Sequence, residues 1–288
     1  MTMSELTRSI TRQWLDVAYG TQSTSQKLDI YLPENGEGPF PVIMHIHGGA
    51  FMFGDKADDQ LRPMLTGLAR GYAVISINYR LSGEALFPAQ IYDVKAAIRW
   101  IKMNAASYQL DASRIALWGG SAGGHLSALA GTSAHDEELD DPHRERMTVT
   151  SEVQAVVDWF GPTNFLTMDE LFVHSAVRPH QVHHAADSPE SRLLGSPIAE
   201  VPELVQAANP ETYISERTPP FLIQHGTHDP LIPTMQSVVF AEKLRAVIGS
   251  DKVSLELLEG AGHGGEAFET TANVNRVLNF IDQYLRTE

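Results

Sequence analysis

The chain has 288 residues, of which 43% are hydrophobic and 20% charged, a size and composition that suit one large α/β domain with an insertion. The net charge of −15 disfavours nucleic acid and anionic lipid surfaces as partners and favours a small neutral molecule. Cysteine is absent, which excludes disulfides and thiolate metal sites. No apolar run approaches the roughly 18 residues of a membrane helix, and residues 1–8 lack the apolar stretch of a secretion signal. We therefore expect no membrane association and a cytoplasmic location.

The N-terminal part of the chain predicts mainly strands. Residues 1–13 indicate a polar helix or a loose arm, and residues 14–19 and 26–32 indicate two strands separated by a polar turn. Residues 41–47 predict a third strand, which ends abruptly at the sequence His47-Gly-Gly-Ala50.

The next segments alternate between the two kinds of element. We expect a helix over residues 59–70, ended by Gly71, and then a strand over residues 72–79. That strand is almost continuously apolar, as expected when both faces of a strand are buried. Pro88 opens a helix whose apolar positions are spaced 3, 4 and 3 apart, which places one packed face on Ile91, Val94, Ile98 and Ile101.

The C-terminal half continues this alternation. Strands are predicted over residues 152–160, 219–225 and 253–258, and helices from Pro233 to Gly249 and along the apolar stripe Val274, Val277, Leu278, Ile281 and Leu285. Such alternation from residue 40 onward indicates an α/β fold, a mostly parallel sheet with helices on both faces. The exception is the segment 162–218, with a short helix at 188–194. We interpret the chain as one domain, 1–288, with 162–218 as a cap inserted after the sixth sheet strand.

One short stretch, residues 114–125, carries the chemistry. A short apolar strand, Ile115–Trp118, leads into Gly119-x-Ser121-x-Gly123, and a run of helix formers follows. Glycines allow the sharp, strained turn that exposes a nucleophilic hydroxyl beside the free N–H groups of a new helix. About 0.1 such patterns are expected by chance in a chain of this length, so the motif needs partners elsewhere.

Those partners are an acid and a base that follow later strands. Asp229 lies four residues after the strand 219–225, and His263 lies in a glycine-rich loop directly after the last strand. Asp158 is a weaker candidate because it lies inside a strand, and Asp251 precedes a strand, at the wrong edge of the sheet. The order Ser121, Asp229, His263 predicts a catalytic triad, in which the histidine is the base and the aspartate orients it.

A fourth feature is the sequence His47-Gly48-Gly49-Ala50 after the central strand. We expect this turn to direct main-chain N–H groups toward a carbonyl oxygen of the substrate. The predicted oxyanion-hole donors are Gly49, Ala50 and Ala122, and His47 is interpreted as a structural brace.

These motifs together resemble the α/β-hydrolase fold carboxylesterases, in particular the bacterial feruloyl-esterase-like branch related to hormone-sensitive lipase. The resemblance covers roughly residues 26–286. The matching segments are His47-Gly-Gly-Ala-Phe-Met-Phe-Gly-Asp-Lys56, Asn78-Tyr-Arg-Leu81, Asp93-Val-Lys-Ala-Ala-Ile-Arg-Trp100, Gly119-Gly-Ser-Ala-Gly-Gly-His-Leu126, Ser188-Pro-Glu-Ser191, His225-Gly-Thr-His-Asp-Pro230 and Gly260-Ala-Gly-His-Gly264.

The resemblance implies an eight-stranded, mostly parallel sheet, no cofactor, and hydrolysis of acyl esters. The short insertion favours short- or medium-chain acyl groups or aryl esters. The chain departs from the family at Ala50, where relatives often have a third glycine; the added methyl group would narrow the pocket or favour a particular acyl group.

Other residues are open to two interpretations. Phe51, Trp159 and Phe160 are core residues or line the acyl pocket. His180, His183 and His184 lie close together in the insertion and could bind a metal. Their spacing along the chain is irregular for metal ligands, so we predict no metal site. A homodimer is compatible with the sequence.

Two alternative functions share these residues. An amidase-type hydrolase, such as an arylformamidase or a peptidase, uses the same triad. A non-catalytic binding protein of this fold usually lacks a triad member, whereas this chain keeps all three.

Overall fold

The computed structural model describes residues 2–142, 149–173, 175 and 177–286. An eight-stranded sheet forms its centre, with the strand order β1-β2-β4-β3-β5-β6-β7-β8. The strands are β1 Gln13–Ala18, β2 Lys27–Tyr31, β3 Phe40–Ile46, β4 Ala73–Ile77, β5 Leu110–Gly120, β6 Ala155–Trp159, β7 Phe221–Gly226 and β8 Val253–Leu258. Strand β2 is antiparallel to both of its neighbours, and the other pairings are parallel. The prediction of an eight-stranded, mostly parallel sheet is confirmed.

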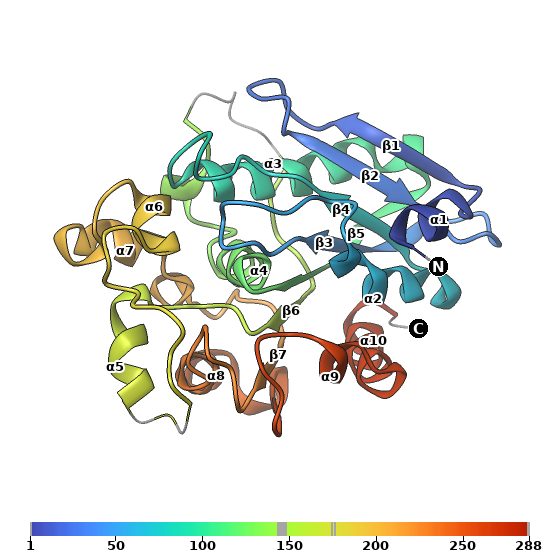
Figure 1. Ribbon diagram of the computed structural model, residues 1–288. Helices are drawn as coiled ribbons and strands as arrows, with labels where there is room; N and C mark the ends of the chain where they lie inside the picture. Colours follow the sequence, from blue (N-terminus) through green and yellow to red (C-terminus); the bar gives the residue numbers. More distant parts are fainter. Residues whose placement is uncertain (1, 143–148, 174, 176, 287–288) are drawn as a thin grey trace.

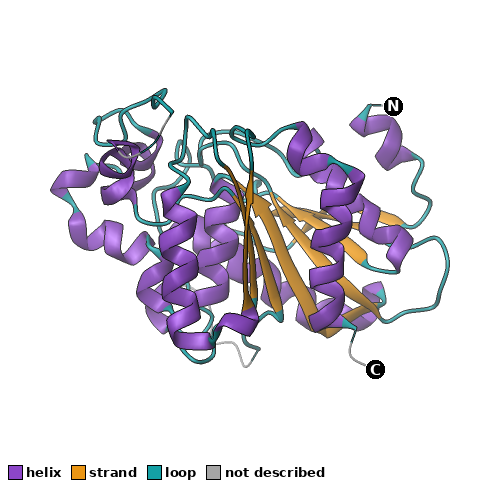
Figure 2. Cartoon of the chain, turned by 90° about the horizontal axis from the view of Figure 1, so that it is seen from below, coloured by secondary structure: helices purple, strands orange, loops and turns teal. Residues whose placement is uncertain are grey.

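Helices cover both faces of this sheet (Figures 1 and 2). They are α1 Met3–Arg8, α2 Arg62–Leu65, α3 Ala89–Asn104, α4 Ala122–Thr132, α5 Met168–Val173, α6 Pro189–Leu194, α7 Pro202–Ala208, α8 Met235–Ile248, α9 Glu266–Glu269 and α10 Thr271–Leu285. Apolar residues of α3, α4 and α8 belong to the core on one face, and those of α2, α9 and α10 belong to the core on the other. The two-faced arrangement expected from the alternating pattern is thus present. None of the helices in the described part of the chain is long and apolar enough to cross a bilayer.

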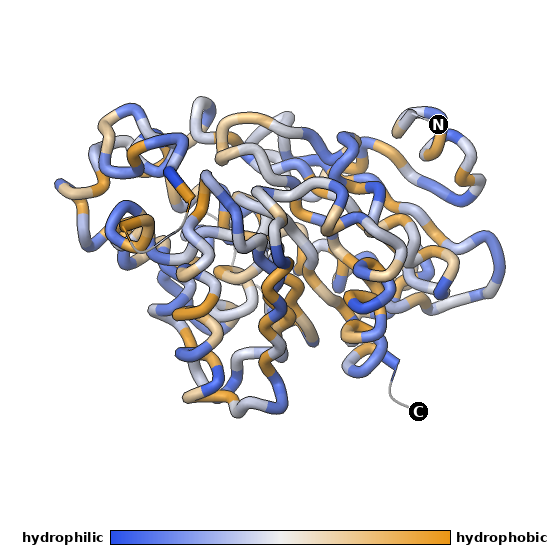
Figure 3. Tube along the Cα trace, turned by 60° about the horizontal axis from the view of Figure 1, so that its bottom comes forward, coloured by the Kyte–Doolittle hydropathy of each residue, from blue (hydrophilic) through white to orange (hydrophobic). Residues whose placement is uncertain are grey.

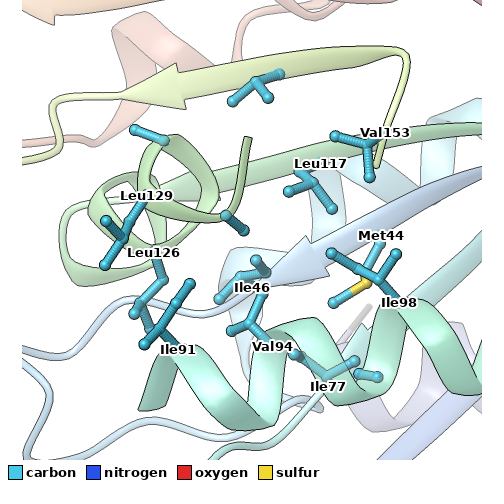
Figure 4. Packing of buried hydrophobic residues seen from close by; sticks show 14 of the residues in the cluster. Met44, Ile46, Ile77, Ile91, Val94, Ile98, Leu117, Leu126, Leu129 and Val153 are labelled. Carbon is cyan, nitrogen blue, oxygen red and sulfur yellow. The ribbon is translucent and has the colours of Figure 1, made fainter. Parts of the chain in front are cut away.

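Side chains of the central strands supply both cores in alternation. On β3, Met44 and Ile46 pack toward α3 and α4, as Figure 4 shows, whereas Ile43 packs on the opposite face. The predicted apolar face of α3 is fully buried, including Ile91 and Ile98. Hydrophobic stretches run through the strands at the centre of the molecule, and hydrophilic stretches lie toward its outside (Figure 3). A sheet buried on both faces holds the ends of its strands rigidly.

One predicted element is wrong in form. Residues 59–70 are not one helix but a 3₁₀ turn, the short helix α2 and a second 3₁₀ turn. Pro63 and Gly67 both disfavour a continuous α-helix, the first because it lacks an N–H and the second because of its conformational freedom. The predicted end at Gly71 is confirmed, since this residue has a left-handed φ of 79°. Strand β5 is also longer than the predicted 115–118.

The segment 162–218 lies between β6 and β7 and contains α5, α6 and α7, which Figure 1 shows together on one side of the molecule. Helix α6 begins as its sequence predicts: the Ser188 hydroxyl accepts a hydrogen bond from the Ser191 N–H, and Pro189 occupies the first turn. Gly195, with φ of 75°, ends it. The role of this segment as a cap stays a prediction.

Candidate active site

Ser121 lies on a sharp turn between β5 and α4. Its φ of 57° and ψ of −123° are strained for a residue with a side chain, at a cost on the order of 1–3 kcal/mol. The neighbouring glycines make this turn sterically possible. A Cβ atom on Gly123 would lie 1.9 Å from the carbonyl oxygen of Ile46, and one on Gly119 would lie 2.3 Å from the main chain of Gly123. Strand and helix therefore approach closely, and the turn places Ser121 at the carboxyl end of the sheet.

His263 and Asp229 meet Ser121 at the same edge. The Nε2 atom of His263 lies 2.8 Å from the Ser121 Oγ, and its Nδ1 atom lies 2.7 Å from the Asp229 Oδ2. These residues follow β5, β7 and β8, which are parallel, so their carboxyl ends share one edge. The three residues that the sequence assigns to a triad thus form one continuous hydrogen-bonded row.

Asp229 is buried, and its carboxylate accepts hydrogen bonds on both oxygens. Oδ1 accepts the main-chain N–H groups of Leu231 and Ile232 at 2.8 and 3.0 Å. Burial raises the pKa of this carboxyl, but the hydrogen bonds from His225 and His263 lower it by more, so the pKa lies well below its ordinary value. Asp229 is therefore a fixed negative charge behind His263.

His225 is a further site residue that the sequence reasoning did not identify. Its Nε2 lies 3.1 Å from the Asp229 Oδ2, and its Nδ1 lies 2.7 Å from the Ser237 Oγ. The side chain is completely buried. One signal was available in the sequence: His225 is the penultimate residue of β7 and stands four residues before Asp229 in the segment His225-Gly-Thr-His-Asp-Pro230.

The rival acids lie elsewhere. Asp158 is completely buried within β6, where its Oδ1 accepts the Gly161 N–H at 3.0 Å. Asp251 is exposed and precedes β8, at the opposite edge of the sheet. Among the contacts of the described residues, His263 meets the carboxylate of Asp229 and neither of these two carboxyls.

The predicted oxyanion-hole residues flank Ser121. Gly49 and Ala50 have left-handed φ values of 117° and 53°, and a Cβ atom on Gly49 would lie 2.0 Å from the Phe53 carbonyl oxygen. Ala122 is the first residue of α4, where N–H groups have no partner within the helix. Within the described ranges, none of these three main-chain N–H groups has a protein acceptor. They are free to donate to a ligand.

His45 lies in β3 and His47 lies in the turn after it, and the contacts of both side chains are structural. His47 stacks on Tyr79 with ring centroids 4.4 Å apart, and its Nδ1 lies 2.7 Å from the Gly48 carbonyl oxygen, as expected for a brace. His45 is fully buried, its Nδ1 lies 2.9 Å from the Ser76 Oγ, and burial lowers its pKa to about 3. His45 is therefore neutral at ordinary pH.

Two pockets adjoin Ser121. The first, of about 340 Å³, has aromatic walls that include Trp159, Phe160 and Phe268. The Phe160 ring meets the His263 imidazole edge-on, with centroids 4.7 Å apart. The second, of about 300 Å³, includes Phe51 in its lining. Phe51, Trp159 and Phe160, which the sequence assigns to the core or to the acyl pocket, are thus buried and also line a pocket.

The histidines of the insertion have other partners. The His183 N–H and the His184 N–H donate to the two carboxylate oxygens of Asp169 at 2.8 and 2.9 Å, and His180 is exposed. In the part of the chain that the structure describes, no three His, Asp or Glu side chains are grouped as metal ligands would be. That the protein needs no metal or cofactor stays a prediction.

The sheet, the strained turn and the chain order of serine, aspartate and histidine are those of the α/β-hydrolase fold. The chain belongs to the BD-FAE family, whose profile matches residues 28–244. The resemblance inferred from the motifs is thereby confirmed at the level of the family.

Known proteins similar to this chain are named as esterases. Esterase LipQ of Mycobacterium tuberculosis is 33% identical over 93% of this chain and 60% of its own length. A solved truncated form of a carbohydrate esterase from gut microbiota is 33% identical, with a TM-score of 0.84, over 97% of this chain and 98% of that chain. A bifunctional GH43-CE from Bacteroides eggerthii is 34% identical, with a TM-score of 0.85, over 94% of this chain and 35% of that chain. The chain spans 54% to 65% of the length of the first curated relatives it matches.

Proposed function

We propose that the chain is a serine carboxylesterase, which hydrolyses short- to medium-chain acyl or aryl esters through an acyl-enzyme intermediate. The observation that carries this proposal is the hydrogen-bonded row of Ser121, His263 and Asp229, with contacts of 2.8 and 2.7 Å. The esterases named among the relatives support an ester as the substrate.

In the first half of the reaction, Ser121 becomes acylated. His263 Nε2 accepts the hydroxyl proton as Ser121 Oγ attacks the ester carbonyl carbon, and Asp229 stabilises the resulting imidazolium. The carbonyl oxygen becomes an oxyanion. When the tetrahedral intermediate collapses, the carbon–oxygen bond to the alcohol breaks and His263 returns the proton to the departing oxygen.

In the second half, water replaces the alcohol. His263 accepts a proton from the water as it attacks the acyl carbon, and the same proton then returns to Ser121 Oγ as the carboxylic acid leaves. The row of hydrogen bonds thus serves both halves of the reaction with one base.

The oxyanion is stabilised in this proposal by the N–H groups of Gly49, Ala50 and Ala122. Their lack of protein acceptors and their position beside Ser121 support this role. Each such donor typically contributes about 3–4 kcal/mol to the transition state. Ala50 lines both pockets, so its methyl group is expected to restrict the acyl group.

The decisive experiment combines labelling with turnover. A fluorophosphonate should modify Ser121, as located by mass spectrometry, and a series of p-nitrophenyl esters from acetate to decanoate should be hydrolysed fastest at short or medium length. Faster turnover of N-formylkynurenine or an aminoacyl anilide than of the esters would identify an amidase. A folded protein that leaves the reagent unreacted would instead be a binding module.

Partners and location stay proposals. The net charge of −15 supports a neutral small-molecule ester and argues against nucleic acid. The cytoplasmic location is a prediction that cell fractionation tests. The homodimer is a prediction that analytical ultracentrifugation tests.

A further inference from the structure

The loop after β7 that carries Asp229 is held by a side chain of the insertion 162–218. The N–H of Ile232 donates to the Asp229 Oδ1 at 3.0 Å. The carbonyl group of the same peptide unit belongs to Leu231, and its oxygen lies 2.9 Å from the Nε2 of His183. Because the N–H and the C=O of a trans peptide point in opposite directions, a donor on the carbonyl side fixes the direction in which the N–H points. His183 is thus linked to the carboxylate of Asp229 through one peptide unit.

The preceding peptide unit is anchored in the same way. The N–H of Leu231 donates to the Asp229 Oδ1 at 2.8 Å. The carbonyl oxygen of that unit belongs to Pro230 and accepts the main-chain N–H of His180 at 2.8 Å. Both N–H groups that hold this carboxylate oxygen are therefore backed by a donor from the insertion. Of the two donors, His183 is the side chain, so it is the one that a substitution can remove.

The His183 ring is completely buried and carries a hydrogen on both nitrogens. Its Nδ1 lies 3.2 Å from the Oε1 of Glu190, and its Nε2 faces the Leu231 carbonyl oxygen. Two oxygen acceptors require two N–H donors, so the ring is an imidazolium. Burial lowers the pKa of His183, but Glu190 and Asp169 raise it by more, so the net shift is upward. The Gln181 amide, 3.4 Å from the same Nδ1, adds at most a long contact.

Helix α5 fixes the position of this ring. The main-chain N–H of His183 donates to the Asp169 Oδ1 at 2.8 Å. The ring stacks on Phe172, with centroids 6.1 Å apart and an angle of 5° between the planes. A ring that is stacked and bonded at both nitrogens has little freedom to follow a movement of the loop, so the loop takes its position from the ring.

We propose that His183 is a positioning residue, which fixes the orientation of Asp229 toward His263 through one peptide unit. The Asp229 Oδ2 meets the His263 Nδ1 at 2.7 Å, so a rotation that releases Oδ1 from its donors also misaligns Oδ2. The inference rests on the proposed esterase function. It gives the insertion a part in the alignment of the triad, through a residue that the sequence suggested only as a metal ligand.

Two substitutions of His183 separate the two contacts of its ring. His183→Gln places an amide nitrogen about as far along the side chain as the Nε2 of histidine, so it can still donate to the Leu231 carbonyl group. His183→Asn places the amide nitrogen near the position of Nδ1, so it can donate to Glu190 alone. Both variants lose the same positive charge, and a purely structural role would therefore affect them alike.

The two variants should differ in kcat. His183→Asn should lower kcat about tenfold with a change in KM below about threefold, whereas His183→Gln should keep kcat within about threefold of the wild type. Rates of p-nitrophenyl acetate hydrolysis are divided by the concentration of serine that a fluorophosphonate titrates, so that unfolded protein does not count. His184→Gln is the matched control and should change neither constant, because the His184 ring contacts Asp169 on α5.

Two further measurements keep the comparison decisive. Each substitution is also made together with Glu190→Gln, which removes the carboxylate that either amide would leave uncompensated, so the variants can be compared where a single substitution does not fold. The proton between the His263 Nδ1 and Asp229 should give a proton NMR signal far downfield, assigned by its loss in His263→Ala. This signal should shift in His183→Asn and stay in place in His183→Gln.

The inference would be overturned by equal kcat values in the two variants, by a larger loss in His183→Gln, or by a loss confined to the free energy of unfolding. If the wild-type protein hydrolyses esters and Ser121 is labelled, these results defeat this inference alone. If no ester is hydrolysed and no label is incorporated, the proposed function fails with it.

Discussion

His225 Nε2 lies 3.1 Å from the Asp229 Oδ2, the oxygen that also receives His263 Nδ1 at 2.7 Å. The same Nε2 lies 3.1 Å from the Ile232 carbonyl oxygen, so it faces two acceptors and must carry a hydrogen. The Ser237 hydroxyl contacts the other ring nitrogen and fixes the ring plane. Asp229 is thus held by two imidazoles and two main-chain N–H groups, and its orientation toward His263 depends on His225.

The first prediction is that His225→Leu lowers kcat about 10- to 100-fold while KM changes less than about threefold, since leucine has no donor and one hydrogen bond to a charged group is lost. Initial rates of p-nitrophenyl acetate hydrolysis over a range of substrate concentrations measure both constants.

The neighbouring exposed His228 provides the control for this variant. His228→Leu should leave kcat and KM unchanged. A folded His225→Leu variant with the kcat of the wild type would show that the contact between Asp229 and His263 does not depend on His225.

The second prediction concerns the hydrogen-bonded row of Ser121, His263 and Asp229. Ser121→Ala and His263→Ala should each reduce kcat by at least about 10⁴-fold, and the double variant should lose little more, because the residues act as a unit. Both single variants should keep the wild-type circular dichroism spectrum. Additive losses in the double variant, or persistent turnover without His263, would show that the base is another residue.

The third prediction tests the close approach between Gly123 and the main chain of Ile46 at the turn that carries Ser121. Gly123→Ala should lower the free energy of unfolding by about 1–3 kcal/mol or more and impair fluorophosphonate labelling, because the new Cβ would lie 1.9 Å from a main-chain oxygen. Gly83→Ala, where nothing lies within 4 Å, should change stability by less than about 0.5 kcal/mol. Urea titrations of both variants give the comparison; equal stabilities would contradict the steric argument.

Much of the fold was predictable from the sequence because its periodic signals are strong. The face of α3, the end of α6 at Gly195 and the bounds of β8 agree with the sequence patterns, since each depends on residue types that only a few local structures accept. The broken segment 59–70 was not predictable from periodicity alone. Its apolar positions suit one helix, but the missing N–H of Pro63 and the conformational freedom of Gly67 interrupt it.

The candidate site was predictable only in part. Ser121 and His263 stand in glycine-rich turns that reveal them, but their catalytic roles stay predictions until tested. His225 was not identified, because it is one of many histidines in the chain. Its significance comes from a three-dimensional contact: the loop after β7 folds so that His225 meets Asp229.

The fourth prediction follows from Asp158, the rejected candidate acid beneath the serine turn. Burial raises the pKa of Asp158 from 3.8 to about 7, against the opposing effect of the Gly161 N–H, and Oδ2 has no partner among the described residues. Between these two pH values the folded state keeps a proton that the unfolded state has released. The contribution of Asp158 to stability should therefore fall as pH rises from about 4 to about 7, by on the order of 1 kcal/mol per pH unit, and level off above the folded-state pKa.

The substitution Asp158→Asn removes this titration while keeping an oxygen that can accept the Gly161 N–H. The free energy of unfolding of the variant minus that of the wild type, from urea titrations at pH 4 to pH 8, should rise across the window and reach a plateau near pH 7. Other carboxyls titrate equally in both proteins, so they cancel in the difference. A difference that is flat with pH would mean that the carboxyl is ionised in the folded protein and that its second oxygen has found a donor.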